Sequence, residues 1–151
     1  MKYKIYLDSC CYNRPYDDLT FSEIADEANS KLHIQSLIKF NALELVTSYI
    51  LVAEIGKNRN EYNRTHILAY IYENTTWYID FDKKKQLDAI AAEVMNKGIK
   101  SMDAAHIACA ILAGCDYFIS TDKRLLKYKA SKIKLVNPLV FAKLWEDEHN
   151  G

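Results

Sequence analysis

The chain has 151 residues, of which 50% are hydrophobic and 26% charged. This is the composition of an ordinary globular protein, and the length fits one domain over residues 1–151 with a sizeable core. Basic and acidic residues number 20 each, so net charge gives no argument for binding to nucleic acid or to an anionic membrane.

The first half of the chain alternates predicted strands with predicted helices. Lys4–Leu7 is typical of a buried strand, and it runs directly into Asp8. Thr20 and Glu23 have the spacing of a capping box, which begins a helix that ends near Phe40. The broad apolar face of this helix comprises Ile24, Ala28, Leu32, Ile34 and Ile38. The remaining elements are a strand over 43–47, a helix capped by Ser48 that ends near Asn58, and a helix over 61–73.

The second half continues the alternation. Its predicted elements are a strand over 77–80, a helix over 83–96, a helix with Ser101 as N-cap, a strand over 116–121, a helix over 122–130, a strand over 133–136 and a helix over 138–146. The helix from Ser101 is apolar on nearly every face, so we expect it to be buried. This pattern predicts an α/β fold with a mainly parallel sheet.

The four cysteines show no paired CxxC spacing, which argues against a structural zinc site. The apolar run at the start of the chain stops at Asp8, too early for a signal peptide. The most apolar stretch, 107–115, is far shorter than a membrane span. We therefore expect a cytoplasmic protein with reduced thiols and no association with membranes.

Four carboxylates occupy unusual places. Asp8 and Asp122 follow predicted strands, Glu54 lies within the apolar segment YILVAEIG, and Asp103 lies in the first turn of the apolar helix. Singly, each has an ordinary explanation as a turn residue, a solvent-reaching side chain or a helix-dipole partner worth about 0.3–1 kcal/mol. Together they are harder to explain, because a buried carboxylate pairs, becomes neutral or binds metal.

In a parallel sheet, ligands bind beyond the carboxyl ends of the strands. We expect the four carboxylates to point into one pocket there, where they would repel each other unless a cation lies among them. Oxygen ligands suit Mg²⁺ or Mn²⁺. Such an ion can activate water and stabilise negative charge on a phosphodiester. The sequence therefore indicates a candidate site for metal-assisted hydrolysis.

The order and the flanking residues of these acids resemble the PIN domain, the nuclease fold of VapC-type toxins. The resemblance runs over about 2–141, and the matching segments are YLDSC, LVAEIGKN, SMDAAHIACA and YFISTDKRLL. It implies a Rossmann-like parallel sheet of four or five strands, in the order 3-2-1-4-5, flanked by helices. It also implies an endoribonuclease that uses Mg²⁺ or Mn²⁺ to hydrolyse RNA, a small antitoxin as partner and a homodimer.

The resemblance assigns residues by position. The catalytic, metal-binding acids would be Asp8, Glu54, Asp103 and Asp122. The first three form the core triad, whereas the participation of Asp122 varies within the family. Ser9 and Thr121 would supply secondary polar contacts.

Basic residues close to the acids are candidates for holding RNA phosphate. Lys123 and Arg124 directly follow Asp122, and Arg14 comes soon after Asp8. The alternative is that these cations only solvate exposed faces.

Two other polar residues lie near these motifs. His106, three residues after Asp103, is expected to have a structural or hydrogen-bonding role. Asp116 begins a predicted strand, and we prefer Asp122 as the fourth acid because ligands bind at the other end of the strand.

Other functions remain open to different degrees. A haloacid-dehalogenase-type phosphatase also has an Asp after its first strand, but it needs a second Asp where Cys10 stands. No Gly-Lys phosphate loop or GxGxxG occurs. A PIN-fold binding protein without activity and a DNA-directed nuclease of the same fold remain alternatives. Cleavage assays on RNA and DNA with metal would separate them.

Overall fold

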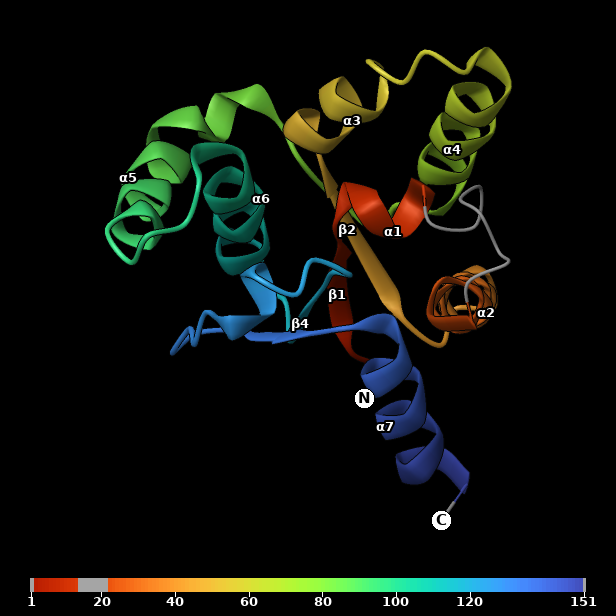
Figure 1. Ribbon diagram of the computed structural model, residues 1–151. Coiled ribbons are helices and arrows are strands. Elements are labelled where there is room, and N and C mark those ends of the chain that lie inside the picture. The colour runs from red at the N-terminus through yellow and green to blue at the C-terminus, as the bar shows by residue number, and fades with distance from the viewer. Residues whose placement is uncertain (1, 14–21, 151) are drawn as a thin grey trace.

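The computed structural model describes residues 2–13 and 22–150. Its centre is a sheet of five strands in the order β3-β2-β1-β4-β5 (Figure 1). Every neighbouring pair is parallel. The strands are β1 (Lys4–Leu7), β2 (Glu44–Ser48), β3 (Trp77–Ile79), β4 (Tyr117–Ile119) and β5 (Lys134–Val136). The predicted α/β fold and its strand order are therefore confirmed.

Helices connect the strands and cover the sheet. They are α1 (Ser9–Asn13), α2 (Ser22–Lys39), α3 (Tyr49–Ile55), α4 (Glu61–Asn74), α5 (Lys84–Met95), α6 (Ser101–Leu112) and α7 (Pro138–Asn150). The described residues also form the short 3-10 turns η2 (Phe81–Lys83) and η3 (Leu125–Lys127). Among the helices of the described ranges, none has the length and apolar character needed to cross a membrane.

Alternate residues of the central strand β1 face two helical layers. The Tyr6 ring lies against His106 of α6, and α5 packs on α6. On the opposite face, Phe141 of α7 packs edge-on against Tyr3 and Tyr117, and α2 packs on α7. Figure 1 shows α5 and α6 together, well separated from α2. Since successive side chains of a strand point to opposite faces, β1 is buried on both.

The prediction of a helix over 122–130 is wrong, because only the 3-10 turn η3 forms there. Asp122 Oδ1 accepts backbone N–H bonds from Arg124 (2.9 Å) and Leu125 (3.3 Å). These bonds cap a single turn, in which the Leu126 N–H donates to the Asp122 carbonyl at 3.1 Å. Leu125 alone is buried in this segment, so no continuous apolar face supports a longer helix.

Two helix starts differ from the prediction. The N-cap of α6 is Lys100 rather than Ser101, because the Lys100 carbonyl already accepts the Ala104 N–H at 2.8 Å. The short helix α1 was not predicted, since five residues are too few to show a helical period. Thr20 of the predicted capping box lies outside the described residues.

The buried face of α2 is rotated relative to the prediction. Ala28, Ile34 and Ile38 are buried as expected, whereas Leu32 is 50% exposed. Lys31 takes the buried place instead and is fully enclosed. The helix therefore buries a residue that hydrophobicity alone would put in solvent.

Candidate active site

Asp8 lies at the carboxyl end of the central strand and is buried, with 6% of its surface exposed. Its backbone N–H donates to the Ile119 carbonyl of β4 at 2.9 Å, which continues the parallel ladder. Its Oδ1 accepts the Ser9 N–H at 2.8 Å, and its Oδ2 accepts the Ser120 hydroxyl at 2.9 Å. The first bond caps the start of α1, so the sharp turn after β1 holds the carboxylate in a defined orientation.

Glu54 reaches the same region from α3, whose N-terminus is capped by Ser48 accepting the Leu51 N–H at 3.0 Å. Glu54 Oε1 accepts a hydrogen bond from the Ser9 hydroxyl, and Oε2 lies 3.1 Å from His106 Nε2. The His106 hydrogen bond, with that from Ser9, lowers the pKa of Glu54 although burial opposes the change. Glu54 is therefore anionic at neutral pH.

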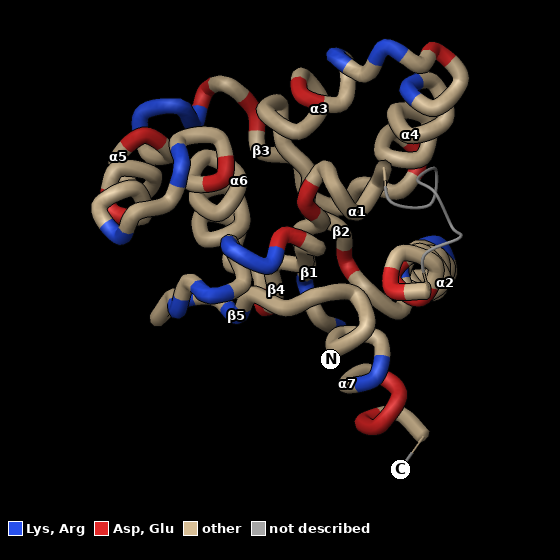
Figure 2. The backbone as a smooth tube through the Cα atoms, in the orientation of Figure 1, with Lys and Arg blue, Asp and Glu red and all other residues tan. Residues whose placement is uncertain are grey.

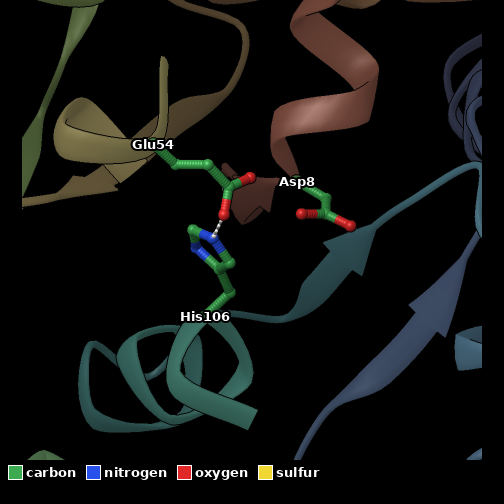
Figure 3. A group of neighbouring side chains, drawn as sticks. All are labelled: Asp8, Glu54 and His106. Atoms are coloured by element: carbon green, nitrogen blue, oxygen red, sulfur yellow. Dashed lines mark hydrogen bonds and ion pairs between the residues drawn. The ribbon is translucent and has the colours of Figure 1, made fainter. Parts of the chain in front are cut away.

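Asp8, Glu54 and His106 each offer one potential ligand atom, and these atoms all lie within 4.8 Å of one another (Figure 3). The three side chains come from the end of β1, from α3 and from α6. Within residues 2–13 and 22–150, no Lys or Arg forms an ion pair with either carboxylate. Two carboxylates this close have the donor chemistry of a Mg²⁺ or Mn²⁺ site.

Asp103 adds negative charge from the first turn of α6. Burial raises the pKa of this carboxyl, and the charges of Asp8, Asp122 and Glu54 raise it further. Figure 2 shows acidic positions at the start of α1, on α3 and on α6, around the ends of the central strands. A divalent cation among these groups would remove the repulsion that raises the Asp103 pKa.

Asp122 is exposed and caps the turn after β4 through its bonds to the backbone of Arg124 and Leu125. It lines a concavity of about 310 Å³ together with Asp103, Lys100 and Arg124. Its backbone role is thus the ordinary one of a turn residue, while its position places a fourth carboxylate next to the third.

Glu54 and Ser9 line a different concavity, of about 500 Å³. Ser9 connects the acids directly, since its backbone binds Asp8 and its hydroxyl binds Glu54. Thr121 is buried and its backbone N–H donates to Cys10 Sγ at 3.4 Å. Of the two residues expected as secondary polar contacts, Ser9 thus contacts both acids, whereas the backbone N–H of Thr121 donates to Cys10.

The candidate phosphate-binding cations differ in their surroundings. Lys123 is exposed and pairs with Glu23 of α2 at 2.9 Å. Arg124 is exposed and lines the concavity that contains Asp103. Arg14 lies outside the described residues.

Sequence reasoning did not predict two features of this region. Ser120, which orients Asp8, is one of several serines, and nothing in its local sequence distinguishes it. His106 was expected to form hydrogen bonds, but not to contact the candidate ligand Glu54. The available signal was its spacing from Asp103, because residues three apart lie on one side of a helix.

The chain thus has a parallel α/β sheet with two carboxylates close together at the carboxyl end of its central strand. The PIN domain family matches residues 5–131. The chain therefore belongs to the PIN domain family, whose members are generally nucleases.

Solved structures with similar folds come from bacterial complexes. VapBC2 from Rickettsia felis, bound to a DNA fragment from their promoter, has a TM-score of 0.56 at 16% identity, covering 89% of this chain and 98% of that one. FitAcB from Neisseria gonorrhoeae has a TM-score of 0.57 at 18% identity, covering 89% of this chain and 97% of that one. FitAB bound to an IR36 DNA fragment has a TM-score of 0.58 at 18% identity, covering 89% of this chain and 95% of that one. Among curated proteins, none matches this sequence.

Proposed function

We propose that this PIN domain is a Mg²⁺- or Mn²⁺-dependent endoribonuclease and the toxin of a toxin–antitoxin pair. The observation that carries the proposal is the approach of Asp8 and Glu54, from different elements, at the carboxyl end of the central strand. The charge of Asp103 beside them supports a site that needs a cation.

Asp8, Glu54 and Asp103 would hold the cation, and Asp122 would add a fourth carboxylate. When bound, the cation would supply an activated water and stabilise negative charge on the phosphodiester. Ser9 and Ser120 hold the Asp8 carboxylate through direct hydrogen bonds.

The concavity beside the acids offers positive charge for a phosphate group. Lys100 and Arg124 line it together with Asp103. Cations beside a metal site can fix the register of a nucleic-acid backbone without reading its sequence. The arrangement supports binding of a polynucleotide whose backbone passes over the acids.

The choice of RNA and of an antitoxin partner rests on the family and its structural relatives. VapBC2 and FitAB are two-component complexes in the structures named above. We propose a small antitoxin protein and a homodimer for this chain by the same likeness. The DNA in those structures is described as a promoter fragment for VapBC2, so it does not favour DNA as the substrate here.

The test is cleavage of structured RNAs and of DNA with Mg²⁺, with Mn²⁺ and with EDTA. Asp8→Asn should abolish cleavage while the protein stays folded, because the amide keeps the shape of the side chain. Asp147→Asn is the matched control, since Asp147 is exposed on α7. Equal cutting by wild type and Asp8→Asn, or cutting in EDTA, would contradict the mechanism. Cleavage of DNA alone would change the substrate, and binding of RNA without any cleavage would favour an inactive binding protein.

A further inference from the structure

A buried line of hydrogen bonds runs from the end of β2 to the Glu54 carboxylate. Ser48 Oγ lies 2.8 Å from Tyr6 Oη, and Tyr6 Oη lies 2.7 Å from His106 Nδ1. His106 Nε2 lies 3.1 Å from Glu54 Oε2. Ser48, Tyr6 and His106 have 0%, 0% and 1% of their surface exposed. Three enclosed side chains thus connect the sheet to a carboxylate at the candidate metal site.

The groups at the two ends of this chain of hydrogen bonds determine which atom donates in each bond. At one end, Glu54 is an anionic carboxylate and can only accept, so His106 Nε2 carries the proton between them. In a neutral imidazole the other nitrogen then accepts, and the Tyr6 phenol must donate to it. Burial raises the pKa of Tyr6 well above its ordinary value, so the phenol has a proton to give.

The same direction satisfies the far end of the line. Ser48 Oγ accepts the Leu51 N–H at 3.0 Å, and its own proton goes to the Tyr6 oxygen. Every donor then has an acceptor.

We propose that His106 is a positioning residue of the candidate metal site: Tyr6 and Ser48 hold its ring with the Nε2–H directed at Glu54, and it fixes the Glu54 carboxylate beside Asp8 without being a metal ligand itself. This inference rests on the proposed function. It assigns a role to three residues that lie outside the acidic set.

The hydrogen bonds explain why His106 positions rather than ligates. Its Nε2 proton points at Glu54, and its Nδ1 lone pair accepts from Tyr6, so neither nitrogen has a lone pair free for a cation. Glu54 needs such a partner because it has three flexible side-chain torsions and sits on a helix of only seven residues. Ser9 holds the other carboxylate oxygen. Each oxygen keeps a second lone pair for a metal.

Two substitutions of His106 distinguish the roles of its two ring nitrogens. His106→Gln places an amide N–H where Nε2 stands, whereas His106→Asn reaches only the Nδ1 position. We expect His106→Asn to weaken Mn²⁺ binding about tenfold, the lower end of the range for outer-shell partners of metal ligands. His106→Gln should retain most of the affinity. The measurement is Mn²⁺ titration followed by electron paramagnetic resonance, with thermal unfolding as a check of the fold.

A spectroscopic readout tests the tautomer and the absence of ligation. In the metal-free protein, ¹⁵N shifts of His106 should show a protonated Nε2 and an unprotonated Nδ1. With Mn²⁺ bound, electron spin echo modulation should show no directly coordinated ¹⁴N. A coordinated nitrogen, a protonated Nδ1, or equal Mn²⁺ affinity of His106→Asn and wild type would overturn the proposal.

A second variant keeps the test decisive if His106→Asn fails to fold. Tyr6→Phe keeps the ring and removes the donor to Nδ1, so it should reduce the Nε2–H tautomer and weaken Mn²⁺ binding severalfold. An unchanged tautomer and affinity would overturn the role of Tyr6 in fixing His106. Asp8→Asn tests the site itself: if it binds Mn²⁺ as well as wild type does, the proposed function fails. If it loses Mn²⁺ while the His106 and Tyr6 variants do not, only the positioning role fails.

Discussion

Two buried polar regions of this molecule differ in how their polar groups are hydrogen-bonded. At the strand ends, Glu54 and His106 are joined to each other and to further donors. On α2, the side chain of Lys31 is also fully buried, yet among the described residues its Nζ has no hydrogen-bond partner. The ammonium group lies over the rings of Tyr12 and Tyr70, 4.7 and 5.7 Å from their centroids. Burial lowers the pKa of Lys31 to about 7.

The difference separates polar groups that organise a site from one that reduces stability. Bonded groups in a low-dielectric interior hold each other in one geometry. A buried cation over aromatic rings recovers about 2 kcal/mol from them, which is less than the free energy of leaving water. We therefore expect substitutions near Glu54 to change activity, and substitutions of Lys31 to change the free energy of unfolding.

The largest expected effect is on catalysis. Glu54→Gln keeps the length of the side chain and an oxygen that accepts from His106, but it removes the negative charge near Asp8. We expect single-turnover RNA cleavage at saturating Mn²⁺ to fall at least about 10²-fold. The free energy of unfolding should change little. Glu73→Gln, an exposed residue of α4, is the control. A loss of stability as large as the loss of activity would show that Glu54 is mainly structural.

The next effect is on stability. Lys31→Met keeps a long unbranched side chain and removes the buried amine, so it should raise the free energy of unfolding by about 1–3 kcal/mol at pH 7. Urea denaturation measures the change. Lys39→Met, on the exposed end of the same helix, should change it by less than about 0.5 kcal/mol. A destabilised Lys31→Met would show that contacts of the amine with the two rings outweigh its desolvation.

The pH dependence of the free energy of unfolding gives a sharper test of the Lys31→Met prediction. The pKa of Lys31 is about 7 in the folded protein against 10.5 ordinarily, so between these values the unfolded chain binds more protons. The contribution of Lys31 to the free energy of unfolding therefore rises with pH. The cost of burying its charged amine is fully present below pH 7. From pH 7 to 8.5 the advantage of Lys31→Met should shrink by up to about 1.4 kcal/mol per pH unit. An advantage that stays constant over this range would mean that the amine titrates normally.

The sequence predicted the parts of this molecule that follow from local pattern. Strand β1 ends where its apolar run meets Asp8, and a parallel sheet brings such ends together, so the approach to Glu54 could be expected. The same reasoning put Leu32 on the apolar face of its helix, whereas the neighbouring Lys31 is the residue that is buried. The rings that enclose Lys31 come from α1 and α4, and no local rule identifies such distant partners.

The direction of the hydrogen bonds at His106 could not be predicted from the sequence either. The Asp103–His106 spacing indicates a shared side of α6, but the hydrogen bonds that hold the His106 ring involve Tyr6 of β1 and, through it, Ser48 of β2. The predicted helix over 122–130 failed for a related reason. Its charged residues have good helix propensity, yet Leu125 is the one residue of this segment that is buried, so no apolar face packs a longer helix against the core.

The smallest expected effect compares two adjacent cations. Arg124 lines the concavity that contains Asp103 and Asp122, whereas Lys123 pairs with Glu23. With uncleaved RNA and Asp8→Asn protein, Arg124→Ala should weaken binding severalfold. It should also lower the slope of log K against log salt by about 0.7, the value for one lost phosphate contact on a single strand. Lys123→Ala should change both quantities less, because its charge is already partly neutralised. Equal effects would mean that the Glu23 pair opens when RNA binds, and Glu23→Gln should then strengthen binding.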